Sequence, residues 1–195
     1  MQSMSEHRAA VLSSMKLTYT KPNGFTEEQA LECFEDHAKL ALIITCAGNQ
    51  LQANDGQFIA FIPFQRILTK QDSADIKGLF PGAVFPGVDN LHTTQIKDDI
   101  RHARGEKEAA HWKRYVTYYA PADAKRKFNA DTAITYSVRL DPGEYYKGKY
   151  NHLDALFIQR KGRGYVNFFC FYTDKAKENF SAYWKAMEGV FRYED

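Results

Sequence analysis

The C-terminal segment, residues 154–195, constrains the fold most, because its hydrophobic pattern changes period part-way. A short apolar run, Leu156-Phe157-Ile158, leads into a basic turn and then into a longer apolar run over residues 165–172. Beyond it, apolar residues recur at three- and four-residue steps, the spacing of one helix face. The pattern predicts two paired strands followed by an amphipathic helix, each with a face that only the other can cover. The helix face consists of Ala176, Phe180, Tyr183, Trp184, Met187 and Phe191.

Length and composition predict one folded domain. The chain has 195 residues, of which 44% are hydrophobic and 26% charged, as in ordinary globular proteins. No linker divides it, so we expect a single domain over residues 16–195 after a flexible or weakly helical lead-in over residues 1–15. No apolar stretch has the length of a signal peptide or a membrane span, which favours a cytoplasmic protein. A mature exported domain without its leader is the alternative.

The N-terminal half shows strand, turn and helix patterns. Alternation predicts a strand over residues 16–20, and Thr26-x-x-Gln29 has the spacing of a capping box before a helix over residues 30–38. An apolar β-branched run over residues 40–46 precedes an expected turn at Gly48-Asn49. Asn54-Asp55-Gly56 predicts a hairpin, since Asp-Gly accepts the positive φ angles of a tight turn. The next strand, residues 57–67, contains Pro63, which limits its length or marks a sheet edge.

The second half continues the mixture of helices and strands. A short helix near residues 73–79 and a long loop to residue 90 are expected first. Thr94 is expected to cap a helix towards Trp112, interrupted by Gly105. Strand patterns cover residues 114–119 and 132–140, and Pro121 begins a helix that ends near residue 129. Asp141-Pro142-Gly143 is a turn pattern.

The sequence offers no spacing that identifies a catalytic or metal site. The six histidines are scattered without an H-x-x-x-H pair, so no metal ligand set and no cofactor are predicted. Cys33, Cys46 and Cys170 lack C-x-x-C spacing, and apolar neighbours favour a buried structural role for Cys33 and Cys170. One disulfide stays open if the protein is exported. We therefore predict no catalytic residues.

Two basic segments are the best candidates for a contact surface. Residues 98–195 carry eighteen Lys and Arg against fourteen Asp and Glu, a net charge of +4 in a chain of net +2. Within this half, a tyrosine-bearing loop and the basic turn combine cations with aromatic rings, which favours an acidic protein partner. The alternative is a solvated loop whose tyrosines pack inward under lysine stems. The predicted contact residues are Tyr145, Tyr146, Lys147, Lys149, Tyr150, Arg160, Lys161 and Arg163.

The C-terminal segment resembles the PsbP-like superfamily. The resemblance comes from the order strand, basic glycine turn, aromatic strand ending Phe171-Tyr172-Thr173-Asp174, amphipathic helix and terminal Val190-Phe191-Arg192-Tyr193. Residues 127–133 and 161–172 also look like a group of Bacteroidetes proteins. The superfamily includes an extrinsic photosystem protein, a Ran-binding import factor and chaperones of secretion effectors. It implies an α+β fold, a central antiparallel sheet of about six or seven strands with helices packed on both faces, and no transferable catalytic motif.

These observations favour a non-enzymatic protein-binding module of a bacterium, for example an effector chaperone or an immunity-type protein. The expected partner is another protein with an acidic surface. One alternative is a small hydrolase that uses Cys170 with a histidine, or a histidine–carboxylate pair. Another is a polyanion or nucleic-acid binder that uses the tyrosine-bearing loop, although nucleic acid is the less favoured partner. Replacing Arg160, Lys161 and Arg163 with serine is expected to weaken an acidic partner and leave the melting temperature nearly unchanged.

Overall fold

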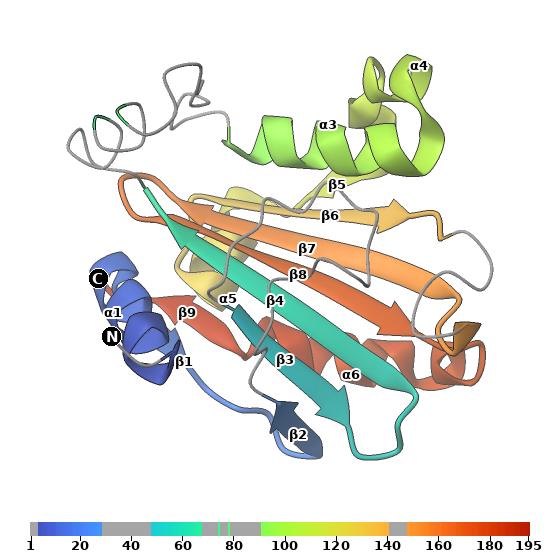
Figure 1. Cartoon of the computed structure of the whole chain (residues 1–195), viewed down its shortest axis with the longest axis horizontal. Coiled ribbons are helices and arrows are strands. Elements are labelled where there is room, and N and C mark those ends of the chain that lie inside the picture. The colour runs from blue at the N-terminus through green and yellow to red at the C-terminus, as the bar shows by residue number, and fades with distance from the viewer. Residues whose placement is uncertain (1–3, 29–47, 68–73, 75–77, 79–90, 141–147) are drawn as a thin grey trace.

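A seven-stranded antiparallel sheet organises the computed structural model, which describes residues 4–28, 48–67, 74, 78, 91–140 and 148–195. Figure 1 shows the strands running across the molecule with helices above and below them. This is the α+β architecture expected from the sequence. From edge to edge the strands are β2 (Phe25–Glu28), β3 (Gly48–Ala53), β4 (Phe58–Arg66), β8 (Gly164–Tyr172), β7 (His152–Arg160), β6 (Thr132–Val138) and β5 (Val116–Tyr118).

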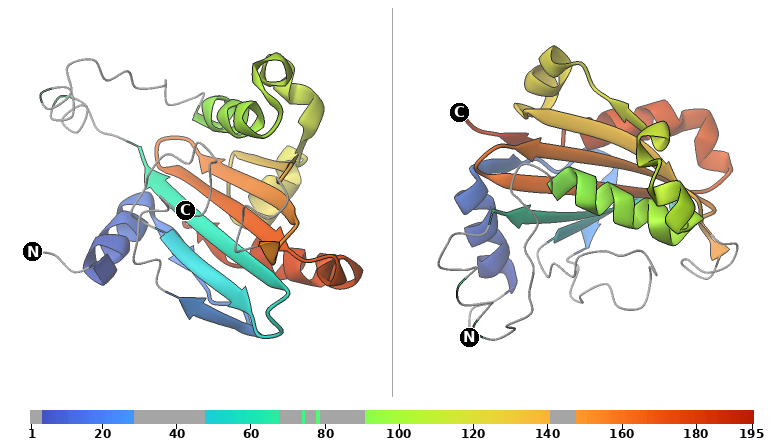
Figure 2. Two further views of the ribbon diagram at one scale, coloured as in Figure 1. Left: turned by 45° about the vertical axis from the view of Figure 1, so that its right-hand side comes forward. Right: turned by 90° about the horizontal axis from the view of Figure 1, so that it is seen from above.

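The two faces of this sheet are covered by different helices (Figure 2). On one face, which we call the α3 face, lie α3 (Leu91–Arg104), α4 (Glu106–Ala109) and the 3-10 helix η2 (Trp112–Tyr115). The opposite face, called the α6 face, carries the remaining described helices. These are α1 (Met4–Met15), α5 (Pro121–Phe128), the 3-10 helix η4 (Lys175–Asn179) and α6 (Phe180–Glu188).

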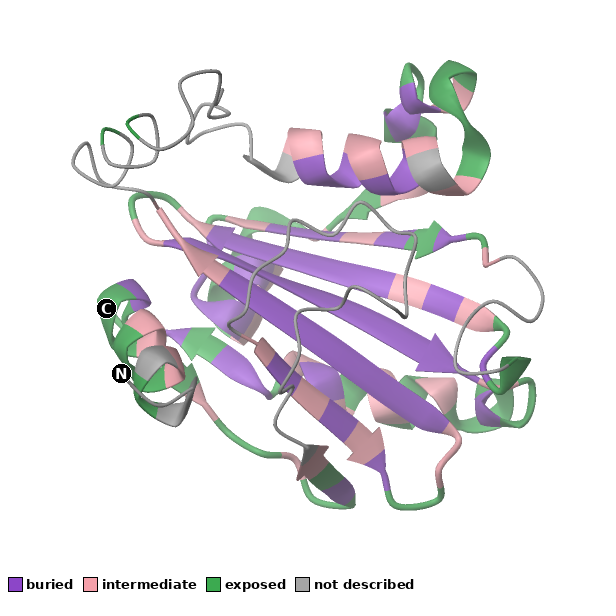
Figure 3. Cartoon of the chain, in the orientation of Figure 1, coloured by how far each residue is buried: buried purple, intermediate pink, exposed green. Residues whose placement is uncertain are grey.

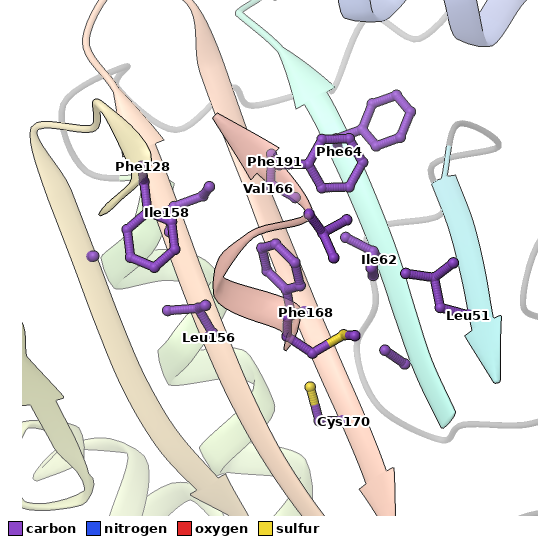
Figure 4. Close-up of a cluster of buried hydrophobic side chains, with 14 of the residues drawn as sticks. Leu51, Ile62, Phe64, Phe128, Leu156, Ile158, Val166, Phe168, Cys170 and Phe191 are labelled. Carbon is purple, nitrogen blue, oxygen red and sulfur yellow. The ribbon is translucent and has the colours of Figure 1, made fainter. Parts of the chain in front are cut away.

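The predicted C-terminal hairpin is confirmed and forms the centre of the sheet. Strands β7 and β8 pair from His152↔Tyr172 to Arg160↔Gly164, and every residue of β8 is buried (Figure 3). Gly164 is required at the turn, because a Cβ there would lie 2.2 Å from the carbonyl oxygen of Gln65. On the α6 face, aromatic and aliphatic side chains from several strands and from helix α5 meet in one cluster, as Figure 4 shows for Phe64, Phe128, Leu156, Ile158, Val166, Phe168 and Phe191.

A second, two-stranded sheet joins the two ends of the described chain. Strand β1 (Leu17–Tyr19) pairs with β9 (Phe191–Tyr193), which confirms the strand expected over residues 16–20. The prediction that Phe191 continues the helix face is wrong, since α6 ends at Glu188 and Phe191 lies on β9. Its ring instead contacts Phe168 across the core, with ring centroids 6.0 Å apart.

Long-range strand pairing overrides two local predictions near the N-terminus. The capping box at Thr26 is wrong within the described residues, because Phe25–Glu28 is strand β2 and pairs with β3. Thr26 donates its hydroxyl to Asn54 Oδ1 at 3.2 Å instead of capping a helix. The expected turn at Gly48-Asn49 is also wrong: both residues belong to β3, and Asn49 is fully buried. The Asn54-Asp55-Gly56 hairpin between β3 and β4 is confirmed.

Two further boundary predictions are corrected. Pro63 neither ends its strand nor marks an edge, because β4 continues to Arg66 between β3 and β8. The register is the same on both sides of the proline, Phe61↔Phe169 and Phe64↔Val166, so the ladder absorbs the missing N–H without an extra residue. Thr94 lies inside α3 rather than at its start.

Several predictions agree with the rest of the described chain. Gly105 separates α3 from α4 with a φ of +90°, a conformation that favours glycine. Strand β5, helix α5 from Pro121 and strand β6 all lie within their expected ranges. The N-terminal helix α1 ends at Met15, which is fully buried. Among the residues described, no helix is long and apolar enough to cross a membrane.

Other predictions fall outside the described residues. They are the helix over residues 30–38, the strand over 40–46, most of the expected helix near 73–79 with the loop that follows it, the turn at 141–143, and the side chains of Cys33, Cys46, Tyr145, Tyr146 and Lys147.

Candidate functional site

An open groove of about 690 Å³ lies on the α6 face, next to the sheet edge formed by β5. Helix α6 packs over the middle of the sheet, and polar side chains occupy the strand positions near the β5 edge. The groove therefore has a floor from β5, β6 and β7 and walls from α6 and the start of α5. We call it the aromatic groove; it is lined by Tyr115, Thr117, Tyr118, Tyr119, Ala120, Asp123, Thr135, Tyr136, Ser137, Asp154, Phe180, Ser181 and Trp184.

The alternation of strand β6 explains why the floor is polar. Ile134, Tyr136 and Val138 are buried in the cluster of the α3 face. Since successive side chains point to opposite faces of a sheet, Thr135 and Ser137 belong to the α6 face. Thr135 is half-buried and Ser137 is exposed, as expected where a helix leaves a strand uncovered.

Asp154 is the charged group of the floor. It lies on β7 directly opposite Ser137, which donates its hydroxyl to Asp154 Oδ1. On the other side Tyr172 donates its hydroxyl to Asp154 Oδ2 at 2.7 Å. Burial, and then this hydrogen bond to a carboxylate, raise the pKa of Tyr172, so the phenol keeps its proton. Within the described chain no Lys, Arg or His pairs with Asp154.

Hydrogen bonds hold the aromatic wall of the groove in place. Trp184 on α6 donates its indole N–H to the Tyr119 hydroxyl at 3.2 Å, and Tyr119 donates to Glu188 Oε1 at 2.7 Å. Glu188 also pairs with Lys127 at 2.5 Å. Burial and the bond to Glu188 raise the pKa of Tyr119 to about 12. The Phe180 and Trp184 rings lie next to each other, with centroids 5.5 Å apart, so the wall is preorganised.

The basic turn predicted as a contact surface lies elsewhere, at the tip between β7 and β8. Arg160 and Arg163 both donate to the carbonyl oxygen of Glu194, the latter at 2.6 Å, and so tie the C-terminus to the hairpin. Lys161 is exposed, and its backbone N–H donates to Asp131 Oδ2 at 2.8 Å. At least two of the three cations therefore have a structural role.

The described part of the tyrosine-bearing loop packs inward. Tyr150 is only 4% exposed, and its hydroxyl lies 3.4 Å from the Gly56 carbonyl oxygen. The Lys149 ammonium lies 5.1 Å from the centroid of the Tyr150 ring, so the lysine covers the tyrosine. The prediction that Tyr150 forms a contact surface is corrected accordingly. This loop and the basic turn lie at opposite ends of β7, about 26 Å apart, so they do not form one surface.

The residues suggested for hydrolytic chemistry are not brought together in the groove. Cys170 is fully buried, and burial followed by the charge of Asp154 raises the pKa of its thiol, which disfavours a thiolate. His152 Nε2 does contact a carboxylate, Asp174 Oδ1, at 2.7 Å. That aspartate is 69% exposed, and neither residue lines the groove. Among the described residues no cluster of His, Cys, Asp or Glu could hold a metal ion.

Sequence reasoning missed the groove residues. Trp184 was assigned to the core because its spacing fits the apolar face of α6, and Tyr119 was treated only as the end of a strand. Asp154 gave a usable signal, since it lies in a segment of alternating polarity, His152-Leu153-Asp154-Ala155, directly before the apolar run of β7. A carboxylate at the start of a buried strand marks the point where coverage of one face stops.

No family model and no curated protein matches the sequence. Among solved structures, the chain is similar to the solution structure of cyanobacterial PsbP (CyanoP) from Synechocystis sp. PCC 6803. The sequence identity is 7%, the TM-score is 0.45, and the match covers 92% of this chain and 88% of that chain. At this level of identity the similarity concerns the fold alone.

Proposed function

We propose that the protein is a non-enzymatic binding module that holds a segment of a partner protein in the aromatic groove. The observation that carries the proposal is the combination of an open groove with a fixed aromatic wall, formed by Phe180, Trp184 and Tyr119. Tyrosine and tryptophan are enriched at the energetic centres of protein interfaces, because a ring buries a large area at a low entropic cost.

The chemistry of the lining supports binding rather than catalysis. The described lining residues include no His, Cys or Lys, and their two carboxylates, Asp123 and Asp154, already accept hydrogen bonds from Arg126 and from Ser137 and Tyr172. A serine or threonine nucleophile is usually activated by an imidazole or an amine. Ser137 donates to Asp154, but the described lining residues of the groove include no imidazole or amine.

An effector chaperone or an immunity-type protein would fit such a module, because both bind one protein partner through a preformed surface. The acidic partner expected for the basic turn stays a prediction, although Arg160 and Arg163 also bind the carbonyl oxygen of Glu194. The aromatic groove and the basic turn are therefore two separate candidate contact surfaces, and each can be tested by itself.

Site-specific crosslinking in the native cell tests the proposed groove. A photo-reactive amino acid at Ser181, an exposed lining residue, is expected to give one discrete adduct with a partner protein. The matched control is Lys185, which is exposed on the same helix but does not line the groove. Filling the groove with Thr117→Trp should abolish the Ser181 adduct, because Thr117 is exposed on the floor.

Three outcomes would contradict the proposal. They are the absence of an adduct from Ser181, an equal adduct from Lys185, and an adduct that persists unchanged in the Thr117→Trp variant. The fold of each variant is checked by its melting temperature, which these surface positions should change little.

A further inference from the structure

The charged side chains that line the aromatic groove are all acidic among the described residues. Its described lining residues include the carboxylates of Asp123 and Asp154 and no Lys, Arg or His. Asp123 is neutralised by Arg126, whose Nη2 lies 2.7 Å from Asp123 Oδ1. No described cation neutralises Asp154. The floor of the groove therefore carries one carboxylate whose charge is balanced by hydroxyl donors alone.

The carboxylate of Asp154 lies at the border of an apolar core. Leu156 and Ile158, further along the same face of β7, are fully buried, and so is the cross-strand neighbour Cys170. A carboxylate next to an apolar core loses hydration, and hydrogen bonds from neutral hydroxyls compensate for this only in part. Ser137 and Tyr172 occupy one lone pair on each carboxylate oxygen and leave the others for a further donor.

The aromatic wall lies close to this carboxylate. Tyr172, which donates to Asp154, has its ring centroid 4.6 Å from that of Phe180, and Phe180 is followed by Trp184 along the wall. Ring faces attract cations, and a cation held between such rings and a carboxylate gains from both. A negatively charged group would instead meet repulsion from Asp154 and from the faces of the rings.

We propose that the segment held in the groove carries a lysine or an arginine whose cationic end pairs with Asp154 while its stem lies against Phe180 and Trp184. This inference rests on the proposed function and names the chemistry of the partner. The charge of the groove is complementary to that of a basic segment.

The size and floor of the groove favour a protein segment over a free amine. A volume of about 690 Å³ is in the range of sites that enclose a ligand of many atoms, far more than one ammonium group needs. The floor extends from Asp154 on β7 to Thr117 on β5, about 10 Å across two strand spacings. The hydroxyls of Thr117 and Thr135 along it can bond the peptide groups of a bound chain.

The two tryptophans provide a test with an internal control. Trp184 lines the groove, whereas Trp112 is 5% exposed in the core of the α3 face. In a ¹⁵N-resolved NMR titration with acetyl-Gly-Thr-Lys-Thr-Gly-amide, or its arginine analogue, the Trp184 indole signal is expected to shift and the Trp112 signal to stay. The same peptide with norleucine in place of lysine should cause no shift, because it keeps the stem and lacks the charge.

Variants connect the shift to the carboxylate. Asp154→Asn should weaken peptide binding about tenfold or more, the loss of one charge-assisted contact. Asp131→Asn, an equal change of charge at the basic turn, should leave it unaltered. An unmoved Trp112 signal confirms that the Asp154→Asn protein is folded, and Ser137→Ala, which removes a donor but keeps the carboxylate, should still bind.

Equal binding of the lysine and norleucine peptides, or unchanged binding by Asp154→Asn, would overturn this inference. Equal binding of butylammonium and the lysine peptide would also overturn it, since the occupant would then be a small cation. The proposed function is tested by a different experiment. It is rejected if Ser181 gives no adduct, or if its adduct persists when Thr117→Trp fills the groove. If the partner crosslinks to the Asp154→Asn variant as well as to the wild type, the proposed function holds and the charge pairing is rejected.

Discussion

Each face of the large sheet carries a carboxylate among aromatic rings, and the two have opposite surroundings. On the α3 face, Asp99 is fully buried: Tyr136 donates to Asp99 Oδ2 at 2.6 Å and Gln95 to Oδ1 at 3.0 Å. On the α6 face, Asp154 is half-buried at the floor of the aromatic groove and accepts hydrogen bonds from the hydroxyls of Ser137 and Tyr172. Both accept two hydrogen bonds from neutral donors.

The extent of helix coverage accounts for the difference. Helix α3 supplies both Asp99 and its donor Gln95 and seals them against the sheet, so this network is satisfied internally. Helix α6 supplies the wall beside Asp154 and leaves the floor open to solvent. The same chemical group is therefore enclosed within the fold where a helix covers it and is available to a ligand where no helix does.

The largest expected effect separates the filled part of the α6 face from the open part. Phe168 is fully buried in the cluster shown in Figure 4, and Phe168→Ala should lower the free energy of unfolding by about 3–5 kcal/mol. Thr117 is exposed on the floor of the groove, and Thr117→Ala should change it by no more than about 0.5 kcal/mol. Urea denaturation of both variants measures the contrast, and similar losses would mean that the groove is packed in solution.

The second-largest expected effect is a pH dependence of stability, which follows from the buried carboxylate of Asp99. Burial raises the pKa of Asp99 to about 7, although the bonds from Tyr136 and Gln95 lower it. The unfolded chain releases this proton near pH 4 and the folded protein near pH 7, so stability is greatest below about pH 4 and is lost as the pH rises through 7. The slope is about −1.4 kcal/mol per pH unit, on the order of 4 kcal/mol in full.

The pH effect is measured as a difference between variants. Asp99→Asn keeps the shape of the side chain and should remove this slope. The free energy of unfolding of the variant should therefore rise relative to that of the wild type as the pH increases from about 4 to 7. Tyr136→Phe removes a bond that lowers the pKa and should extend the slope to higher pH. Parallel stability curves for wild type and Asp99→Asn would show that Asp99 is not sealed as described.

A smaller effect tests whether the wall of the groove is fixed. Tyr119→Phe removes the acceptor for Trp184 and a donor to Glu188. We expect a loss of about 1–2 kcal/mol in the free energy of unfolding, since one of the two bonds involves a carboxylate. Trp184 fluorescence should also become more sensitive to acrylamide. Unchanged stability and quenching would indicate a mobile wall.

The smallest effect concerns the basic turn, which the sequence favoured as the contact surface. Arg160→Ala with Arg163→Ala removes two bonds to the Glu194 carbonyl and should lower Tm by up to about 3 °C. Lys161→Ala should lower Tm less than this double change, because the Lys161 side chain is exposed. The earlier expectation that the triple serine variant keeps its Tm is therefore revised. Equal Tm values for all variants would restore it.

The sequence predicted best where a pattern reports on a local period. The β7–β8 hairpin was predicted from two apolar runs around a basic glycine turn, the helix at residue 121 from the fixed φ of proline, and the break at residue 105 from glycine. Each of these signals lies in a few neighbouring residues. Thr26 and Pro63 were misassigned for the opposite reason, since their conformation is decided by strands far away in the sequence.

Local sequence patterns could not predict the candidate site. Asp154, Tyr119 and Trp184 come from three separate parts of the chain, and the packing of α6 against the sheet brings them to one groove. Charge runs and aromatic clusters drew attention to residues 145–150 and 160–163 instead. The packing of Tyr150 and the bonds of Arg160 to the C-terminus depend equally on tertiary contacts that a run of basic residues does not report.

Hydrogen exchange on the complex with the crosslinked partner tests the central claim most directly. Once that partner is purified, binding should slow amide exchange in α6 and β5, which line the aromatic groove, and leave residues 160–164 unchanged. Protection confined to residues 160–164, with α6 and β5 exchanging as in the free protein, would contradict the account and make the basic turn the binding surface.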